Sequence, residues 1–293
     1  MTQGNPTRTP ETLRRYFEQG AAVLKRYTRE TGHIWQDDPL AFADWLDACR
    51  REWRPMTWRR YRQGLKLHLE ADLAPQSLID RLDDPISGSA RPAPDARPMK
   101  RIPPDVLDRY LAHIDRGRGA VDVLLSRFLR ANIEIGLRPG EWALARLRRD
   151  RLTVQNEKTT NGRSNGPVRR LTVRPPAQSL VRRAFEERDR LLSQGATWAE
   201  LQRAMVLRLA AIRREHGLPH ITLYSTRHQF AANAKSAGLT QRQVADLMGH
   251  ASDQTAAAHY GRRVSGRGQI YVQFVAPDRA PTATPGRGTN PAV

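Results

Sequence analysis

The chain has 293 residues, and its 49 Lys and Arg against 30 Asp and Glu give a formal net charge of +19 and a pI near 11.2. Such a field attracts polyanions, nucleic acid first, and this length spreads the charge over one or two domains rather than a short tail. A mean hydropathy of −0.66 and the lack of any apolar run near the ~20 residues of a membrane span argue against a membrane protein, and the single Cys49 excludes an internal disulfide and a Cys-based zinc site.

The first 82 residues predict a helical domain. Apolar residues recur at helical spacing from Leu13 to Tyr27 and again up to Cys49, and a third helix is indicated from about Met56. On this third helix the basic residues lie off the apolar face. In a chain of this charge we interpret them as phosphate contacts rather than solvated surface: Arg59, Arg60, Arg62 and Lys66.

Residues 83–103 carry five prolines without helical periodicity and predict an extended linker. Beyond it, the pattern predicts helices over PPDVLDRYLAHI, 119–135, 177–193, 197–216, 222–237 and 240–248, and a hairpin of strands at 152–154 and 171–173. Residues 104–275 therefore form a second domain, and the fold class is mainly α with a small antiparallel β-hairpin or sheet. The tail, 276–293, has too few apolar residues to fold alone, and we expect it to be disordered or to pack on another subunit.

Candidate functional residues gather in this second domain. Arg138 follows a predicted helix cap in GLRPGEW, which is weak by itself because arginines are so frequent here. Tyr224, Arg227 and His228 stand at i, i+3 and i+4, so one helical face presents a phenol, a guanidinium and an imidazole.

The run after that helix adds His250 and, ten positions on, Tyr260. A phenol has an ordinary pKa of about 10, so a Tyr that attacks phosphorus needs cations and hydrogen-bond donors around the phosphate. The same stretch, 240–261, also has helix-turn-helix spacing, which a basic protein could use to bind DNA. That motif wants apolar residues where this chain has His250 and Thr255.

In chain order, GLRPGE, a hairpin holding a Lys, a helix with Arg-His, and GH followed by a Tyr resemble the tyrosine recombinase or phage integrase family over nearly the whole chain. The resemblance implies a helical N-terminal core-binding domain and a mixed α/β catalytic domain. It implies that Arg138 and Arg227 clamp the scissile phosphate, that Lys158 protonates the departing 5′ oxygen and that His250 hydrogen-bonds a phosphate oxygen. Tyr260 would then be the nucleophile, and Arg169 and Arg170 of the hairpin would add DNA contacts.

Two features depart from the family pattern. Tyr224 occupies the place of a usual His, and a phenol can donate one hydrogen bond but cannot act as a cation. The interval of ten from His250 to Tyr260 is one longer than in many members, which could shift the nucleophile's helix.

The sequence thus predicts a site-specific DNA recombinase or integrase, of the kind found on mobile elements, that cleaves and rejoins duplex DNA through a 3′-phosphotyrosyl intermediate. By resemblance it acts as a homo-tetramer on paired sites, and no cofactor or metal is called for. Two alternatives remain: a non-catalytic DNA-binding regulator using 240–261 as a helix-turn-helix, and a relaxing topoisomerase of the same chemistry. The opening MTQGNPTRTP has no apolar signal core, so we expect a cytoplasmic, nucleoid-associated protein.

Overall fold

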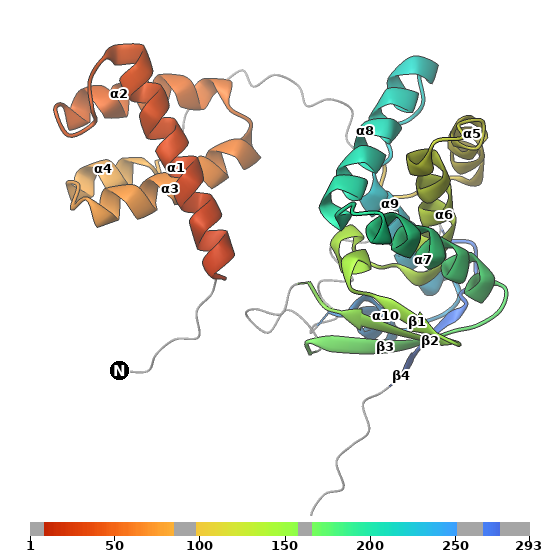
Figure 1. The fold of residues 1–293 in the computed structure, drawn as a ribbon. Coiled ribbons are helices and arrows are strands. Elements are labelled where there is room, and N and C mark those ends of the chain that lie inside the picture. The colour runs from red at the N-terminus through yellow and green to blue at the C-terminus, as the bar shows by residue number, and fades with distance from the viewer. Residues whose placement is uncertain (1–8, 85–97, 158–165, 251–265, 276–293) are drawn as a thin grey trace, which may run out of the picture. The chain divides into compact units, whose positions relative to one another are not determined.

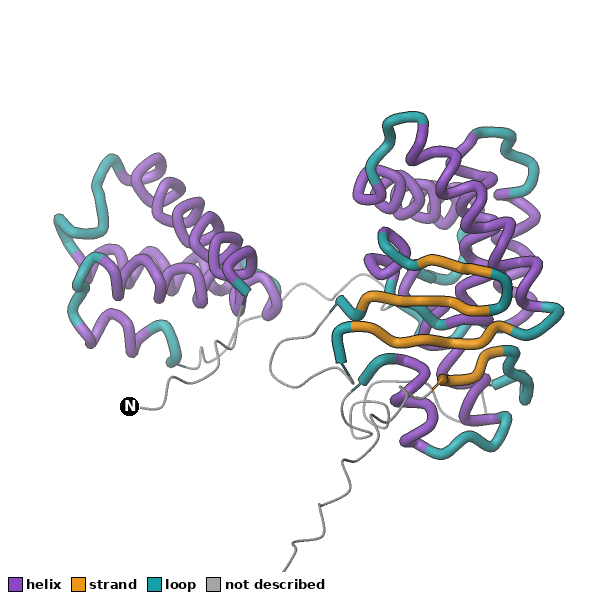
Figure 2. The backbone as a smooth tube through the Cα atoms, turned by 60° about the horizontal axis from the view of Figure 1, so that its bottom comes forward, coloured by secondary structure: helices purple, strands orange, loops and turns teal. Residues whose placement is uncertain are grey.

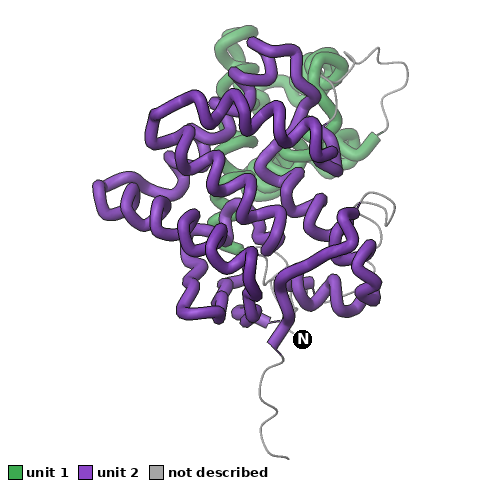
Figure 3. Tube along the Cα trace, turned by 90° about the vertical axis from the view of Figure 1, so that its right-hand side faces the viewer, with its two compact units in different colours: residues 1–96 green, residues 97–293 purple. Residues whose placement is uncertain are grey.

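The computed structural model describes residues 9–84, 98–157, 166–250 and 266–275. The chain divides into two compact units, Met1–Ala96 and Arg97–Val293, coloured separately in Figure 3. Their boundary lies inside the range predicted as a linker, but the end of that range differs from the prediction. The Met99 amide donates to the His220 carbonyl at 2.7 Å and Ile102 is 1% exposed, so these residues are part of the larger unit's packing.

The smaller unit is helical, as its apolar periodicity predicts. It contains α1 (Pro10–Thr31), α2 (Pro39–Glu52), α3 (Pro55–Ala71) and the short α4 (Gln76–Arg81), which was not predicted. Helices α1 and α3 cross closely at Gly20 and Gly64, where a Cβ on either residue would collide with the backbone of the other helix. The first turns of α1 pack less than the periodicity suggests, because Leu13 and Phe17 remain exposed.

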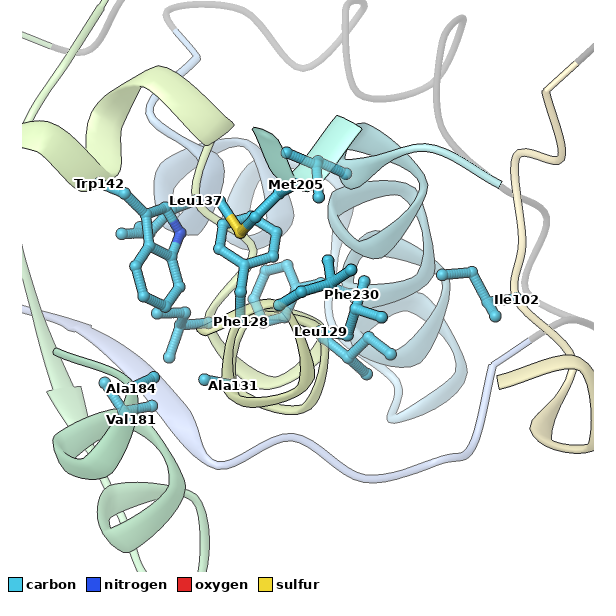
Figure 4. Close-up of a cluster of buried hydrophobic side chains, with 14 of the residues drawn as sticks. Ile102, Phe128, Leu129, Ala131, Leu137, Trp142, Val181, Ala184, Met205 and Phe230 are labelled. Carbon is cyan, nitrogen blue, oxygen red and sulfur yellow. The ribbon is translucent and has the colours of Figure 1, made fainter. Parts of the chain in front are cut away.

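The larger unit follows the predicted helices closely. They are α5 (Pro104–Ile114), α6 (Ala120–Ile135), α7 (Ala177–Ser193), α8 (Trp198–His216), α9 (Leu223–Ser236) and α10 (Gln241–Met248), with a 3-10 turn, η1 (Pro139–Ala143), after α6. Both predicted capping boxes are confirmed, at Thr197 with Glu200 and at Thr240 with Gln243. Figure 4 shows α6 at the centre of the core, where Phe128 lies among side chains of neighbouring elements.

A four-stranded antiparallel sheet completes the larger unit (Figure 1), in the order β1 (Arg146–Arg148), β2 (Arg151–Gln155), β3 (Val168–Val173) and β4 (Val272–Val275). The predicted hairpin is confirmed, with Leu152 opposite Leu171. The sheet's inner face carries the apolar residues and packs on the helices, while its outer face is turned away from them (Figure 2). The fold class is therefore as predicted. Among the described residues, none of the helices is long and apolar enough to cross a membrane.

Candidate active site

The centre of the candidate site is a carboxylate, Glu141 on η1, that three guanidinium groups surround. Its side chain receives Arg138 Nη1 at 2.6 Å and Arg169 Nη2 at 2.7 Å, and Arg227 Nη1 lies 3.7 Å away. The Arg138 backbone amide also donates to Glu141 Oε2 at 2.8 Å. Burial by itself would raise the pKa of Glu141, but Arg169, Arg227 and Arg138 together lower it to about 2. Glu141 is therefore ionised at neutral pH and holds the three arginines in one place.

Arg227 is fully buried and fixed by backbone carbonyls from two other elements. Its Nη1 donates to the Gly136 carbonyl at 2.6 Å, and its Nη2 donates to the Met248 carbonyl at 2.6 Å. A guanidinium has a rigid, planar set of donors, so these bonds fix the orientation of the whole group. The Arg227 side chain of α9 thereby connects the GLRPG loop to the end of α10.

Two glycines make these carbonyls available. Gly136 ends α6 with φ +64°, and a Cβ there would collide with the Phe230 ring. Gly249 ends α10 with φ +68°, and a Cβ there would lie 2.5 Å from Asn156 Oδ1 and 2.8 Å from Arg169 Nη1. Both positions combine a left-handed backbone with close packing, which only glycine accepts without strain.

His250 lies directly against Arg227 and is 2% exposed. Its Nε2 is 3.1 Å from Arg227 Nη2, and a guanidinium can only donate, so Nε2 must accept and the ring proton resides on Nδ1. Burial, followed by the charges of Arg227, Arg138 and Arg169, lowers the pKa of His250 to about 3. The imidazole is therefore neutral at physiological pH and offers one N–H donor.

The cluster has an excess of positive charge. Within the described residues of the cluster, Arg138, Arg169 and Arg227 bring three charges, Glu141 neutralises one, and the neutral His250 adds none. Two uncompensated positive charges in a buried site are costly unless an anion binds there. The arrangement is suited to a phosphate group, because the cations are fixed before the ligand arrives.

Two buried asparagines support the site and were not predicted. Asn132 on α6 receives the Leu137 amide and the Trp142 indole N–H on Oδ1, and its Nδ2 donates to Thr226 Oγ1 at 2.7 Å. It thereby joins α6, the GLRPG loop and α9. Asn156, after β2, hydrogen-bonds Arg169 through Oδ1 and donates to the Gly166 carbonyl, so it ties the base of the β2–β3 hairpin to the cluster.

The structure brings together Arg138, Arg227 and His250 from the predicted site. Tyr224 lies one turn before Arg227 on α9, half-buried, with its ring edge-on to His228 at 5.1 Å between centroids. Lys158 and Tyr260 lie outside the described residues. Among the described residues, no three His, Cys, Asp or Glu side chains are grouped to hold a metal ion.

The predicted DNA contacts fall into three groups. Arg59, Arg60 and Arg170 are exposed, whereas Arg62 and Lys66 are half-buried and pair with Asp83 at 3.0 and 2.5 Å. The expectation for Arg169 is wrong in this structure: its guanidinium is fully buried and bonded to Glu141, so it has no surface with which to contact DNA. Arg169 instead supports the cluster from within.

No model of a known protein family matches the sequence, and no curated protein matches it. Solved structures do share its fold. One is a lambda integrase dimer bound to a COC′ core site, with a TM-score of 0.56 and 14% identity over 92% of this chain and 76% of that one. Another is the XerH site-specific recombinase bound to a difH substrate, with a TM-score of 0.51 and 16% identity over 86% of this chain and 75% of that one. The fold is therefore that of the tyrosine recombinases, and identities this low establish the fold alone.

Proposed function

We propose that this protein is a tyrosine-type site-specific recombinase that cleaves and rejoins duplex DNA. The observation that carries the proposal is the buried cluster of Arg138, Arg227 and neutral His250, in which Glu141 is the one carboxylate among three guanidinium groups of the described residues. A phosphodiester has one negative charge and gains a second when an oxygen nucleophile adds to phosphorus. Fixed donors that match this gain stabilise the transition state more than the ground state.

In the proposed reaction, the Tyr260 hydroxyl attacks the phosphorus and loses its proton to water, and the bond from phosphorus to the 5′ oxygen breaks. Lys158 gives that oxygen its proton, while Arg138, Arg227 and the Nδ1–H of His250 donate to the non-bridging oxygens. The product is a 3′-phosphotyrosyl bond and a free 5′ hydroxyl. Attack by the 5′ hydroxyl of another strand reverses these steps, so strand joining needs no external energy source.

The partner in this proposal is duplex DNA, and the acting form is a homo-tetramer on two paired sites. The support is the fold shared with a lambda integrase tetramer bound to a Holliday junction, at a TM-score of 0.54 and 15% identity over 92% of this chain. The net charge of +19 favours the same partner. We place the protein in the cytoplasm, on the nucleoid.

Covalent trapping tests the proposal. Wild type is incubated with sheared genomic DNA, denatured with detergent, and the attached DNA is recovered and sequenced, which also identifies the cleavage site. We expect an adduct with wild type, loss of it in Tyr260→Phe, and full yield in the control Tyr271→Phe, whose hydroxyl bonds Gln269. An adduct that persists in Tyr260→Phe overturns the assignment of the nucleophile. Duplex binding by wild type without any adduct favours a DNA-binding regulator.

The recovered site then separates two reactions. A plasmid with two copies of it should yield recombinant circles, whereas relaxed circles alone indicate a topoisomerase.

Lys158→Arg keeps the charge but loses the transferable proton, so cleavage should fall by about 10²–10⁴-fold, with Lys25→Arg as the matched control. Sulfur at the 5′ bridging position leaves without protonation and should restore the rate of Lys158→Arg. Without this rescue, Lys158 is not the acid.

A further inference from the structure

The outer face of the sheet, the turn after β1 and the neighbouring helix α7 carry a set of arginines that the proposed reaction does not use. They line two adjoining hollows, one over the strands and one between β1 and α7, that share the β1 residues and the turn after them. We call this surface the arginine face, and it consists of the exposed residues Arg146, Arg148, Arg149, Arg151, Arg170 and Arg182.

Elsewhere in the unit some exposed arginines, such as Arg118 and Arg203, have no carboxylate partner among the described residues, and others do. Arg127, Arg130, Arg190 and Arg208 pair with carboxylates. Within the described residues, no guanidinium of the arginine face has an ion pair or a hydrogen bond. The surface therefore presents six guanidinium groups to solvent, and the exposed carboxylates Asp150 and Glu186 line the same hollows.

Two features of the arginine face lower the local stability of the fold. Arg148 on β1 stands directly opposite Arg151 on β2, and like charges at opposed positions destabilise a strand pair. Arg149, in the turn between them, has φ +55°, a left-handed conformation that disfavours every side chain and suits glycine. Both features cost local stability, and an anion bound at these arginines would offset that cost.

The strand arginines of the arginine face are separate from the buried cluster, because they lie on the opposite side of the sheet, and Arg182 adds to them from α7 beside β1. Side chains alternate along β3, so Arg169 points inward to Glu141 while its neighbour Arg170 points outward. In Figure 2 the strands are seen from the outer side, and the described helices do not cross in front of β1 to β3. A phosphate held by Arg138 and Arg227 cannot also contact this surface.

We propose that the arginine face binds the phosphate backbone of a DNA segment other than the one held at the buried cluster. Guanidinium groups match phosphate oxygens with paired donors, and here they extend from β3 to α7 rather than along one row. An acidic peptide that joined the sheet would use the backbone of the edge strand β1, whereas these arginines project from the face. The breadth of the charge favours a duplex.

The test compares three full-length proteins. The first is wild type, the second is Arg148→Ala/Arg151→Ala/Arg170→Ala, and the third removes the same charge from paired arginines, Arg15→Ala/Arg130→Ala/Arg242→Ala. Each protein is bound to an immobilised duplex, and capture of a second, labelled duplex is measured against salt. We expect capture by the arginine-face variant to fall about ten-fold or more. Its log–log salt slope should be smaller by about 0.9 for each phosphate that is no longer neutralised, or ~2.7 for all three. The paired-arginine variant should stay near wild type.

Equal capture by the two triple variants overturns the inference, because bridging would then rest on contacts between subunits alone. Soluble polyglutamate tests whether the ligand is an acidic protein instead. If it displaces the labelled duplex from wild type only weakly and binds the two triple variants equally, an acidic protein is excluded as the ligand of the arginine face. If instead only polyglutamate binding depends on the arginine face, the ligand is an acidic protein and the inference fails. Covalent trapping is measured in parallel, so loss of capture with an intact adduct separates this inference from the proposed function.

The variant Arg149→Gly provides an independent test, because a loss of DNA capture in this variant cannot be explained by a loss of folding stability. Glycine relieves the left-handed strain, so the thermal midpoint should rise by about 2–4 °C. Second-duplex capture should nevertheless fall. A variant that is more stable and captures as well as wild type shows that Arg149 has no part in binding.

Discussion

The role of Glu141 as the hub of the site predicts a specific dependence of stability on pH. The carboxyl pKa is lowered from its ordinary 4.5 to about 2, which corresponds to about 3 kcal/mol of folding free energy at neutral pH. The sign follows from the ionised form being the one that the fold favours. This contribution is complete above pH 4.5 and is lost as the pH falls toward 2.

Replacing Glu141 with Gln removes this dependence and leaves three guanidinium groups without a counter-charge. We expect Glu141→Gln to be less stable than wild type by about 3–5 kcal/mol at pH 7, the usual cost of breaking a buried ion pair. Between pH 5 and pH 2 the difference should shrink by about 3 kcal/mol, because only wild type still has this carboxylate to protonate.

Native-state hydrogen exchange of the α6 and α9 amides is the suitable assay, since it reports on the larger unit separately from the smaller one. The matched control is Glu187→Gln, which removes another buried carboxylate that pairs with two arginines, Arg127 and Arg190, outside the cluster. Glu187→Gln should keep DNA cleavage, whereas Glu141→Gln should lose it because Arg138 and Arg227 are released. If Glu141→Gln retains the wild-type loss of stability below pH 5, the carboxylate is not held by the arginines as described.

Three further predictions concern single positions. The pKa of His250 is about 3 in the folded protein, so its imidazole stays neutral there, whereas in the unfolded chain it takes up a proton as the pH falls below 6.5. The folding free energy of wild type should therefore drop by about 2 kcal/mol more than that of His250→Gln between pH 7 and pH 5, measured by the same exchange assay. Gly249→Ala should cost at least ~2 kcal/mol and impair cleavage, whereas Gly217→Ala, equally left-handed at φ +59° but with open space, should cost about 1 kcal/mol in chemical denaturation. Leu73→Gly should stabilise the smaller unit by about 1 kcal/mol, because Leu73 is 90% exposed at φ +54°.

The sequence contains enough information for most of the larger unit. Helix ends follow from local chemistry, such as the Gly136 cap and the Thr197 capping box, and these were placed within a residue or two. The strand β1 was not foreseen because three residues, RLR, cannot show an alternation. It becomes a strand only by pairing with β2, which is a property of the sheet rather than of the segment.

The error at Arg169 has a different origin. Leu171 and Val173 are buried on the inner face of β3, and the two-residue period of a strand places Arg169 on that same face. The alternation was therefore readable, but a buried arginine is unfavourable until its carboxylate is known. That carboxylate, Glu141, is supplied from η1, 28 residues earlier in the chain, and local patterns cannot report a contact at that distance.

The neutral state of His250 explains why a histidine serves beside Arg227. A positively charged side chain at this position would be a fourth cation and would raise the excess of the cluster from two charges to three. A phosphodiester reaches only two negative charges when an oxygen adds to phosphorus. The neighbouring guanidinium groups prevent this by lowering the pKa of the imidazole to about 3. The same contact that keeps the ring neutral, from Arg227 Nη2 to Nε2, fixes the proton on Nδ1. The arginines thus set both the charge of His250 and the direction in which it donates, so the cluster has a fixed charge and a defined donor before any ligand binds.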